Sequence, residues 1–542
     1  YYIQVANHEN AEQFFREALT LCKGILPEIE SHCHAGLAAL AEERNQQLQA
    51  LAHYRNAVQA IAKLRHSFWQ PALAGSYLRA VKDTLDKAVQ LAASQRAAQE
   101  TLFFMESNKA QTLSRLIYAD GFTPVAEMPA EIELLGNEIR QLQAQIRAIY
   151  HPSPWSRSVG DVKALQAKLI EAAQTYDKRL AELERQSVGP LSVSVPEFVL
   201  DRFRKEADSH LGKSWLALNY YLTERNIIVS MVTSDSLEVF ETAISARVRM
   251  ALDVCLRSHR SAQHLSPGDM KALGQALLPG QIQAYLSSPD TPLVICPHRD
   301  LHSVPWAALR PEWDAMHLVE LCIPLLVPSL HLLELLWQRT AQIPKKERKT
   351  GLLLGISDFQ GKSSDLPAAI REVQSIAEIA HPDSRCLLDS EATWSALREQ
   401  AAQGFSPFAF LHLSSHISHD PRTGRLSSLA LHDREITLEQ IRALAPLPGL
   451  VTFSACNGAQ SLVYEGDEHV GMAITSLMAG ANTVIGSLWL VLDSTPAAGM
   501  TVFYQAYFAG FSPARALAQA QRASIHQGEQ LRNWAGFICL GS

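Results

Sequence analysis

The sequence predicts a multidomain chain in which an all-α helical array and a helical hairpin precede a large α/β domain with a mostly parallel sheet. The first part shows helical patterns throughout, and the second shows a heptad seam followed by a helical pattern with one apolar face. From about residue 196 onward, short apolar runs alternate with helical stretches, which is typical of a parallel sheet with helices on both faces. The expected divisions are residues 1–125 (array), 126–190 (hairpin), 196–343 (first α/β lobe) and 350–542 (second α/β lobe).

Composition narrows the class of protein. The chain has 542 residues, of which 47% are hydrophobic, and a net charge of -7, which argues against a general nucleic-acid-binding protein. The eight cysteines are scattered without a CxxC pair, so neither a disulfide framework nor a zinc site is expected, and no cofactor is expected either. No apolar run is long enough to span a bilayer, and no signal peptide is recognisable, so we expect a cytoplasmic protein without a membrane partner.

The N-terminal part carries a small–aromatic–small pattern typical of the second helix of a TPR repeat. The pattern occurs twice, 39 residues apart, at Ala11-x3-Phe15-x2-Ala18 and Ala50-x3-Tyr54-x2-Ala57. A plain helical bundle remains the alternative interpretation. Either arrangement offers a surface to a protein partner.

The next part contains two seams of apolar residues at heptad or near-heptad spacing. The seams comprise Leu135, Ile139, Leu142, Ile146 and Ile149, and then Leu165, Leu169, Tyr176, Leu180 and Leu183. They predict an antiparallel hairpin, which acts either as a lever between array and α/β domain or as a passively packed element.

Two apolar runs in the last part end on residues that can carry chemistry. The run 449–453 leads into Ser454-Ala455-Cys456-Asn457, and the run 408–413 leads into Ser414-Ser415-His416. Ligands of α/β sheets bind at the carboxyl ends of the strands, and a thiol needs a base to become a thiolate. The sequence therefore predicts Cys456 as a nucleophile beside His416, while His412, inside its strand, is expected only to pack.

These motifs resemble those of the CHAT domain, a group of caspase-like, separase-related cysteine proteases of bacteria that are often fused to TPR repeats. The resemblance covers roughly residues 196–542 and rests on His-Leu-Ser-Ser-His (412–416), Ser-Ala-Cys (454–456), Gly-Ser-Leu-Trp-Leu-Val-Leu-Asp (486–493) and Leu301-His302-x-x-Pro305, with residues 103–110 resembling the helix that precedes many CHAT domains. It implies that residues 196–343 form an inactive caspase-like lobe with a structural His302. It also implies that residues 350–542 form the catalytic lobe.

The resemblance also implies roles for individual residues. His416 would be the general base and Cys456 the nucleophile, and the backbone N–H groups of Cys456 and Ile417 would bind the oxyanion. The family usually has glycine at the position of Ile417, so its side chain is expected to narrow the site or turn the amide away.

Three acidic residues are candidates for substrate binding. Asp493 is expected to pair with an arginine or lysine before the cleaved bond, with a helix cap formed together with residues 494–496 as the alternative. Glu465 and Asp467 are candidates for the same pairing, or else belong to a solvated loop.

The expected function is a cysteine endopeptidase that a protein partner activates through the helical repeats. The resemblance includes antiphage defence as a role and gasdermin-like pore formers as substrates. The alternative is a non-catalytic CHAT/TPR scaffold or adaptor that binds proteins.

Overall fold

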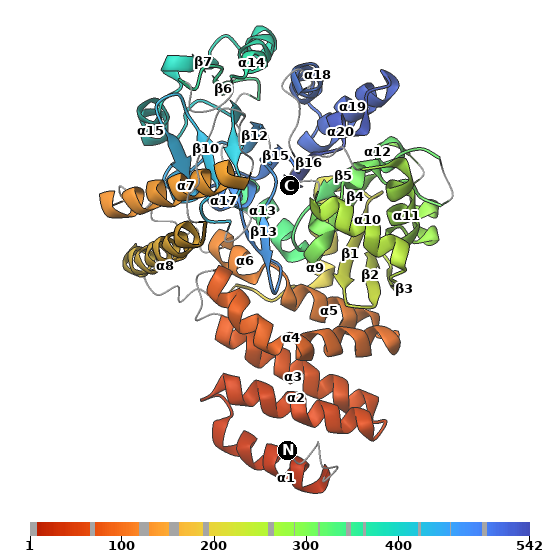
Figure 1. Cartoon of the computed structure of the whole chain (residues 1–542). Helices are drawn as coiled ribbons and strands as arrows, with labels where there is room; N and C mark the ends of the chain where they lie inside the picture. Colours follow the sequence, from red (N-terminus) through yellow and green to blue (C-terminus); the bar gives the residue numbers. More distant parts are fainter. Residues whose placement is uncertain are drawn as a thin grey trace.

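A helical array, a projecting hairpin and an α/β domain make up the computed structural model of the chain (Figure 1). The structure describes residues 8–65, 71–118, 129–150, 162–187, 195–257, 265–286, 288–312, 315–342, 348–360, 365–420, 424–455, 457–489 and 496–542. No helix within these ranges is long and apolar enough to cross a membrane.

The array stacks helices antiparallel at one end of the molecule (Figure 1). Ala50 and Ala57 are fully buried, so neighbouring helices approach closely, and Tyr54 fills the space between them and donates a hydrogen bond to Glu42 at 2.5 Å. The expected helical character of this part is confirmed. Its helices are α1 (His8–Cys22), α2 (Pro27–Glu43), α3 (Gln47–Arg65), α4 (Pro71–Ser94), α5 (Ala98–Asn108) and α6 (Gln111–Tyr118).

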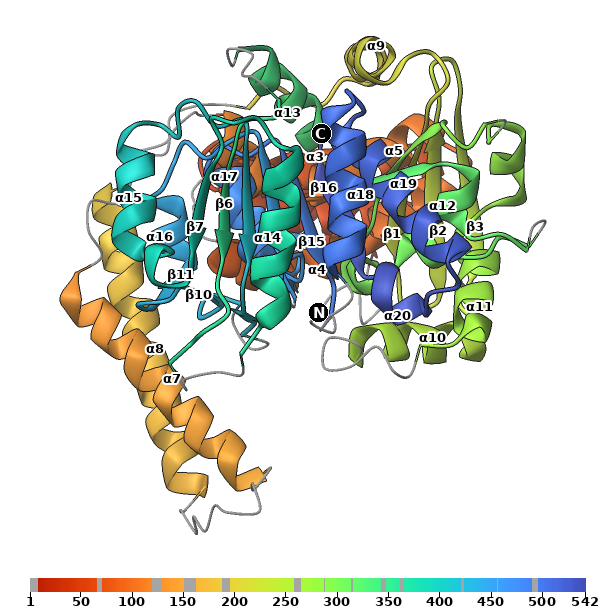
Figure 2. The ribbon, with the colours of Figure 1, turned by 90° about the horizontal axis from the view of Figure 1, so that it is seen from above.

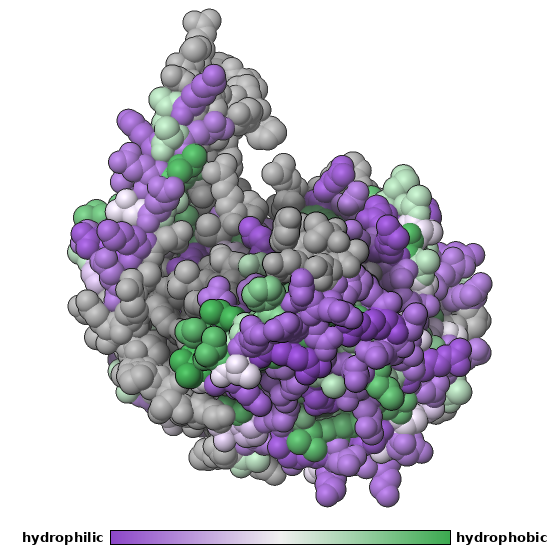
Figure 3. All heavy atoms as spheres, turned by 90° about the horizontal axis from the view of Figure 1, so that it is seen from below, coloured by the Kyte–Doolittle hydropathy of each residue, from purple (hydrophilic) through white to green (hydrophobic). Residues whose placement is uncertain are grey.

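The far end of the array is largely hydrophilic, with separate hydrophobic patches (Figure 3). Exposed apolar side chains in α1, in α2, between these two helices and at the start of α3 are Phe14, Leu21, Ile25, Leu26, Ile29 and Leu48.

The hairpin consists of α7 (Ala130–Tyr150) and α8 (Val162–Ser187), and it extends away from the body (Figure 2). Its described seam residues pack with Ile132 and with one residue of the α/β domain, Leu426, and comprise Leu135, Ile139, Leu142, Leu165, Leu169 and Tyr176. The seam positions Ile146, Ile149, Leu180 and Leu183 have side chains outside the described part of the chain. The contact with Leu426 attaches the base of the hairpin to the second lobe.

One sheet of eleven strands runs through both lobes, in the order β3-β2-β1-β4-β5-β16-β15-β12-β8-β6-β7. Most neighbours are parallel, as the sequence predicted, because helices connect the strands across the faces. The strands are β1 (Leu216–Leu222), β2 (Asn226–Val232), β3 (Leu237–Ala243), β4 (Pro292–Cys296), β5 (Ile323–Leu326), β6 (Gly351–Gly355), β7 (Arg385–Leu388), β8 (Phe410–Ser414), β12 (Leu450–Ser454), β15 (Thr483–Ser487) and β16 (Phe537–Gly541).

The C-terminal strand β16 joins the two lobes. It lies antiparallel to β15 over five residues and pairs with β5 at Leu540 and Leu326. The two expected lobes therefore share one continuous sheet, which the order of the apolar runs along the sequence did not indicate.

Helices cover both faces of this sheet (Figure 2). α14, α18 and α19 form one layer, and α17 packs on the other face, toward α6. The central strands are buried along their whole length because both faces are covered. The helices are α9 (Leu200–Leu211), α10 (Ala246–Arg257), α11 (Pro267–Leu277), α12 (Leu318–Leu321), α13 (Leu330–Gln342), α14 (Pro367–Ile379), α15 (Trp394–Ala402), α16 (Leu438–Arg442), α17 (Met472–Met478), α18 (Pro496–Phe508), α19 (Pro513–His526) and α20 (Leu531–Trp534), with short 3-10 turns η2 (Gly280–Ala284), η3 (Arg299–Ser303), η4 (Trp306–Ala308) and η5 (Asp389–Glu391).

Two small sheets lie beside the main one. The first has the order β11-β10-β9, with β9 (Ile417–Ser418), β10 (Ser428–Ala430) and β11 (Glu435–Thr437). The second is the hairpin of β13 (Leu462–Tyr464) and β14 (Glu468–Val470). β11 forms because Ile436 alternates with polar neighbours and pairs with Leu429, and the helix α16 that follows it is short.

Candidate active site

Two adjacent parallel strands place the predicted dyad. β8 and β12 are in register over five pairs, the last being Ser414 with Ser454. His416 lies two positions beyond Ser414, and Cys456 lies two positions beyond Ser454. Neighbouring strands in a sheet are about 4.8 Å apart. The register therefore directs the two segments out of the sheet side by side, at the edge where α/β proteins bind ligands.

Cys456 itself lies outside the described residues, whereas Ala455 and Asn457 on either side of it are described. The Asn457 N–H donates to the carbonyl of Trp489 at 3.3 Å, and Ala459 N–H donates to the carbonyl of Ser487 at 2.9 Å. The segment after Cys456 is thus bound along the end of β15.

Glycines make this close approach feasible. A Cβ atom at Gly486 would lie 2.8 Å from the backbone nitrogen of Ala459, and one at Gly458 would lie 2.6 Å from Cβ of Phe453. Both distances are shorter than real Cβ contacts. Gly486 lets the end of β15 lie against the segment after Cys456, and Gly458 lets that segment fold back against Phe453 of β12.

His416 follows β8 and is half-buried. Its ring lies 4.6 Å from the ring of Phe359, measured between centroids, and Phe359 belongs to the segment after β6. Its carbonyl accepts a hydrogen bond from the N–H of Ala430 at 2.9 Å, which fixes the backbone on the β10 side. The imidazole therefore has a defined position and still reaches the surface.

The backbone N–H of Ile417 points to the outer edge of β9. Because His416 and Ala430 form a hydrogen-bonded pair, the next pair, Ile417 with Leu429, is a non-hydrogen-bonded one. The side chain of Ile417 is only 6% exposed and belongs to the main core. The side chain of Ile417 is therefore directed into the core.

Glu465 and Asp467 do not lie with the dyad. They form the turn of the β13–β14 hairpin, which reaches toward α4 and α6. Glu465 pairs with Arg299 at 3.1 Å, and Asp467 is completely buried. The expected substrate role is therefore corrected for both residues: their carboxylates already bind groups of the protein. Both residues are close to Cys456 in the sequence, and this proximity does not indicate that the β13–β14 hairpin turns away from the dyad in space. Asp493, the third candidate, lies outside the described part of the chain.

Asp467 is the centre of a buried junction, which we define as Lys109, His298, Arg299, His302 and Asp467. Its carboxylate accepts the N–H of Arg299 at 2.9 Å and lies 3.4 Å from Nε2 of His302 and 4.0 Å from Nε2 of His298. Burial would raise the pKa of Asp467, but His298, His302 and Lys109 outweigh burial and hold it below its ordinary range. The buried charge is thus compensated within the junction.

The junction ties the array to both lobes. Lys109, which is fully buried, donates to the Asn219 side chain at 2.6 Å and to the carbonyls of Cys296 and Pro297 at 3.0 and 2.9 Å. Glu106 accepts the N–H groups of Leu330 and His331 at the start of α13. The segment 103–110, identified in the sequence only by resemblance, thus connects the array to the first lobe through these hydrogen bonds.

His412 is buried beneath the dyad, as expected for a packing residue. Its Nε2 lies 2.9 Å from Glu372 and its Nδ1 lies 3.2 Å from the hydroxyl of Tyr504, which donates to Thr452 at 3.0 Å. This network joins β8, β12, α14 and α18 below the candidate site.

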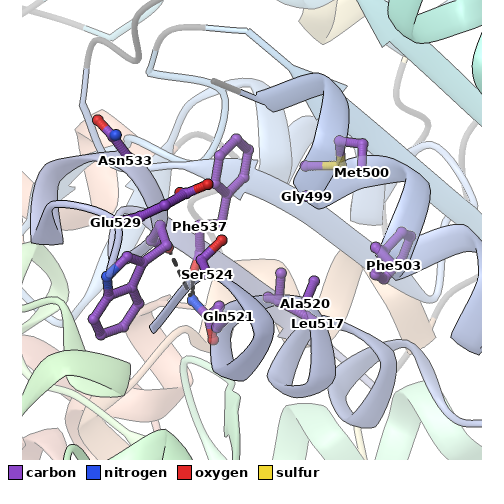
Figure 4. Close-up of a pocket in the computed structure, with 11 residues that line it drawn as sticks. Gly499, Met500, Phe503, Leu517, Ala520, Gln521, Ser524, Glu529, Asn533 and Phe537 are labelled. Carbon is purple, nitrogen blue, oxygen red and sulfur yellow. Dashed lines mark hydrogen bonds between the residues drawn. The ribbon is translucent and has the colours of Figure 1, made fainter. Parts of the chain in front are cut away.

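Two hollows are apparent outside the dyad. One, of about 360 Å³ including space open to solvent, lies between α18, α19 and the C-terminal segment and is mainly apolar, with Gln521 bonded to backbone carbonyls (Figure 4). The other, of about 320 Å³ by the same measure, lies beside the segment after Cys456 and is lined by Cys255, His302, Ser303, Ala459, Gln460, Ser461 and Leu488. Within the described ranges, no group of three or more His, Cys, Asp or Glu residues could hold a metal ion.

Comparison with protein families identifies the class. The family model described as CHAT domain matches residues 268–542, half of the chain. The chain therefore belongs to the CHAT domain family, and the resemblance noted from the sequence is confirmed. No curated protein matches the chain.

Solved structures with a similar arrangement include proteases. The chain is similar to separase in a separase–securin complex of Saccharomyces cerevisiae, with 11% identity and a TM-score of 0.44 over 98% of this chain and 48% of that one. The chain thus spans about half the length of that separase. It is also similar to the Arg-specific cysteine proteinase gingipain R, with 12% identity and a TM-score of 0.34 over 53% of this chain and 73% of that one.

Proposed function

We propose that this chain is a cysteine endopeptidase in which Cys456 is the nucleophile and His416 the general base. The observation that carries the proposal is the register of β8 and β12, in which both residues follow paired serines by two positions. Family membership supports the same reading.

The reaction would proceed through an acyl-enzyme. His416 takes the thiol proton, and the thiolate of Cys456 attacks the carbonyl carbon of a peptide bond. The backbone N–H groups of Ile417 and Cys456 stabilise the oxyanion. The carbon–nitrogen bond then breaks and His416 gives its proton to the leaving amine. Water, deprotonated by His416, attacks the thioester, releases the carboxylate product and restores the thiol.

Control by a protein partner fits the way the array is attached. The β13–β14 hairpin follows the Cys456 segment, and Glu468 at its end accepts the N–H and hydroxyl of Thr112 in α6 at 3.1 and 3.0 Å. Ala110 N–H donates to the carbonyl of Gly466 at 3.1 Å. A partner that moves the array would therefore act directly on the hairpin, provided that it binds the active form more tightly than the resting one.

The family resemblance supplies candidates for the biological setting. Cytoplasmic antiphage defence, with a gasdermin-like pore former as the protein substrate, is the setting that we propose. We also propose that the substrate residue before the cleaved bond is basic and that Asp493 binds it.

The decisive experiment compares the unchanged protein with Cys456→Ala against candidate protein substrates. We expect cleavage to be lost entirely, with the circular dichroism spectrum and melting temperature unchanged. Cys386→Ala serves as the control, because Cys386 is a partly buried cysteine of β7, away from the dyad. Cleavage that survives Cys456→Ala at an appreciable rate would leave the scaffold or adaptor alternative.

A further inference from the structure

The two peptide groups that flank residue 456 are both attached to the end of β15. The carbonyl of Ala455, on one side, accepts a hydrogen bond from the hydroxyl of Ser487 at 2.9 Å. The N–H of Asn457, on the other side, donates to the carbonyl of Trp489 at 3.3 Å. The same Ser487 hydroxyl lies 2.8 Å from the Trp489 carbonyl, so its single proton is shared between the two acceptors.

This arrangement is enclosed and rigid. The side chains of Ser487 and Trp489 are both fully buried. The indole N–H of Trp489 donates to the carbonyl of Arg532 at 2.9 Å, and Gly536 lies so close to the indole that a Cβ there would be 2.6 Å from it. Trp489, whose carbonyl lies beside the Ser487 hydroxyl, is therefore itself held in place.

A carbonyl that is held also fixes the N–H of the next residue. The carbonyl of Ala455 and the N–H of residue 456 belong to one planar peptide group, and in a trans peptide the two bonds point in opposite directions. A hydroxyl that binds the carbonyl from one side therefore directs the N–H to the other side.

We propose that Ser487 is a positioning residue for the oxyanion hole, because its hydroxyl sets the orientation of the peptide group that supplies the Cys456 N–H. The inference rests on the proposed cysteine-protease function and adds a residue to it. Ser487 touches neither the substrate nor the sulfur, and it acts through the backbone alone.

The role predicts which reactions of Cys456 depend on Ser487. Acylation of the thiolate by an ester passes through a tetrahedral oxyanion, which the N–H stabilises. Alkylation by iodoacetamide displaces iodide directly and forms no oxyanion. Loss of the Ser487 hydroxyl should therefore slow the first reaction and leave the second nearly unchanged.

The test uses the full chain and two small probes, so that no natural substrate is needed. Acylation of Cys456 by p-nitrophenyl acetate is measured with Cys456→Ala as the blank, and alkylation by iodoacetamide is followed by peptide mass spectrometry. In Ser487→Ala we expect acylation to fall by about ten- to a hundredfold and alkylation to change by less than about threefold. Ser487→Thr, which keeps the hydroxyl, should recover most of the acylation rate.

Ser476→Ala is the matched control. Ser476 is also buried, and its hydroxyl donates to the carbonyl of Met472 at 3.0 Å inside α17. We expect it to leave both rates unchanged, although it too loses a buried hydroxyl–carbonyl bond. If the ratio of the acylation rate to the alkylation rate is the same in Ser487→Ala as in the unchanged protein, Ser487 does not have the proposed role. A Cys456 that is no more reactive than the buried cysteines in the unchanged protein overturns the protease proposal itself.

Discussion

The two halves of the large sheet carry a histidine at equivalent places and differ in what surrounds it. His298 lies two residues after the end of β4, and His416 lies two residues after the end of β8. His298 is 1% exposed and stacks on Tyr221 at 4.1 Å, whereas His416 is half-buried beside Phe359. The same strand-end position thus supports a sealed histidine in one half and an accessible one in the other.

The protonation of His298 follows from its contacts. Its Nδ1 accepts the N–H of Leu222 at 2.9 Å, so the ring's proton is on Nε2, toward Asp467. Burial, more than any neighbouring charge, lowers the pKa of His298 well below its ordinary value. A neutral histidine with both faces enclosed can position a carboxylate but cannot exchange protons with a substrate. Access to the surface, more than the strand-end position, therefore distinguishes the surroundings of His416 from those of His298.

The largest expected effect separates the two histidines directly. His416→Ala should lower the rate of peptide cleavage by at least about a thousandfold, since general base and nucleophile act as a unit. His298→Ala should instead lower the free energy of unfolding by about 2–4 kcal/mol, because it leaves a cavity and unpaired groups beside Asp467. Cleavage rates and urea unfolding of both variants provide the measurement. If the folded His298→Ala protein loses as much activity as His416→Ala, the division between the halves fails.

Substrate specificity should depend on Asp493 and not on Glu465. A preference for arginine or lysine before the cleaved bond should fall by about thirty- to a thousandfold in Asp493→Ala, because an unpaired substrate charge is costly in an enclosed site. Glu465→Ala is the control. Glu465 lies in the turn of the β13–β14 hairpin and binds Arg299, so its loss should leave the preference for a basic residue intact. A positional-scanning peptide library measures both. An apolar or acidic preference in the unchanged enzyme would refute the assignment.

A smaller effect on the reactivity of Cys456 is expected at the contact between α6 of the helical array and the β13–β14 hairpin. Glu468→Gln weakens the charge-assisted bonds to Thr112 and should raise the partner-free rate at which iodoacetamide alkylates Cys456 by about two- to tenfold, by loosening the resting arrangement. Glu100→Gln is the control, because Glu100 pairs with Arg55 wholly within the array, at 2.7 Å. Equal alkylation rates in the two variants would contradict control of Cys456 through the β13–β14 hairpin.

A further prediction concerns the pH dependence of stability. Burial, and then the charges of His302 and Lys109, lower the pKa of His469 to about 3 in the folded protein, against about 6.5 when unfolded. Between these values the unfolded state binds the extra proton, so the free energy of unfolding falls by up to about 1.4 kcal/mol for each pH unit of acidification. Above pH 6.5 this contribution is fully present.

His469→Gln should remove this part of the slope, and urea unfolding between pH 4 and 7 measures it. His526→Gln, which changes an exposed histidine, should leave the slope as it is. An identical slope in His469→Gln and the unchanged protein would show that His469 does not contribute to the pH dependence of stability in this way.

Sequence patterns were informative where local chemistry decides the outcome. Buried apolar runs located β8 and β12 and hence the order in which His416 and Cys456 leave the sheet, and heptad spacing located the helical hairpin. They failed where pairing is long-range: nothing local in residues 537–541 indicates a strand between the two lobes. For the same reason Glu465 and Asp467 were assigned to the substrate, because their partners Arg299 and His302 lie more than 160 residues earlier. Ser487 was noticed only as part of a motif, since a hydroxyl bound to a distant carbonyl leaves no periodic signal.

The place of β16 bears on how the molecule is made. Residues 537–541 fill the gap between β5 and β15, so a chain that lacks them, whether truncated or still emerging from the ribosome, presents two half-sheets with unpaired edges. Gly536, just before β16, is also the residue that packs on Trp489, the support of the segment around residue 456. The candidate active site therefore depends on the same residues that close the sheet, and a folding chain completes it only once β16 lies between β5 and β15.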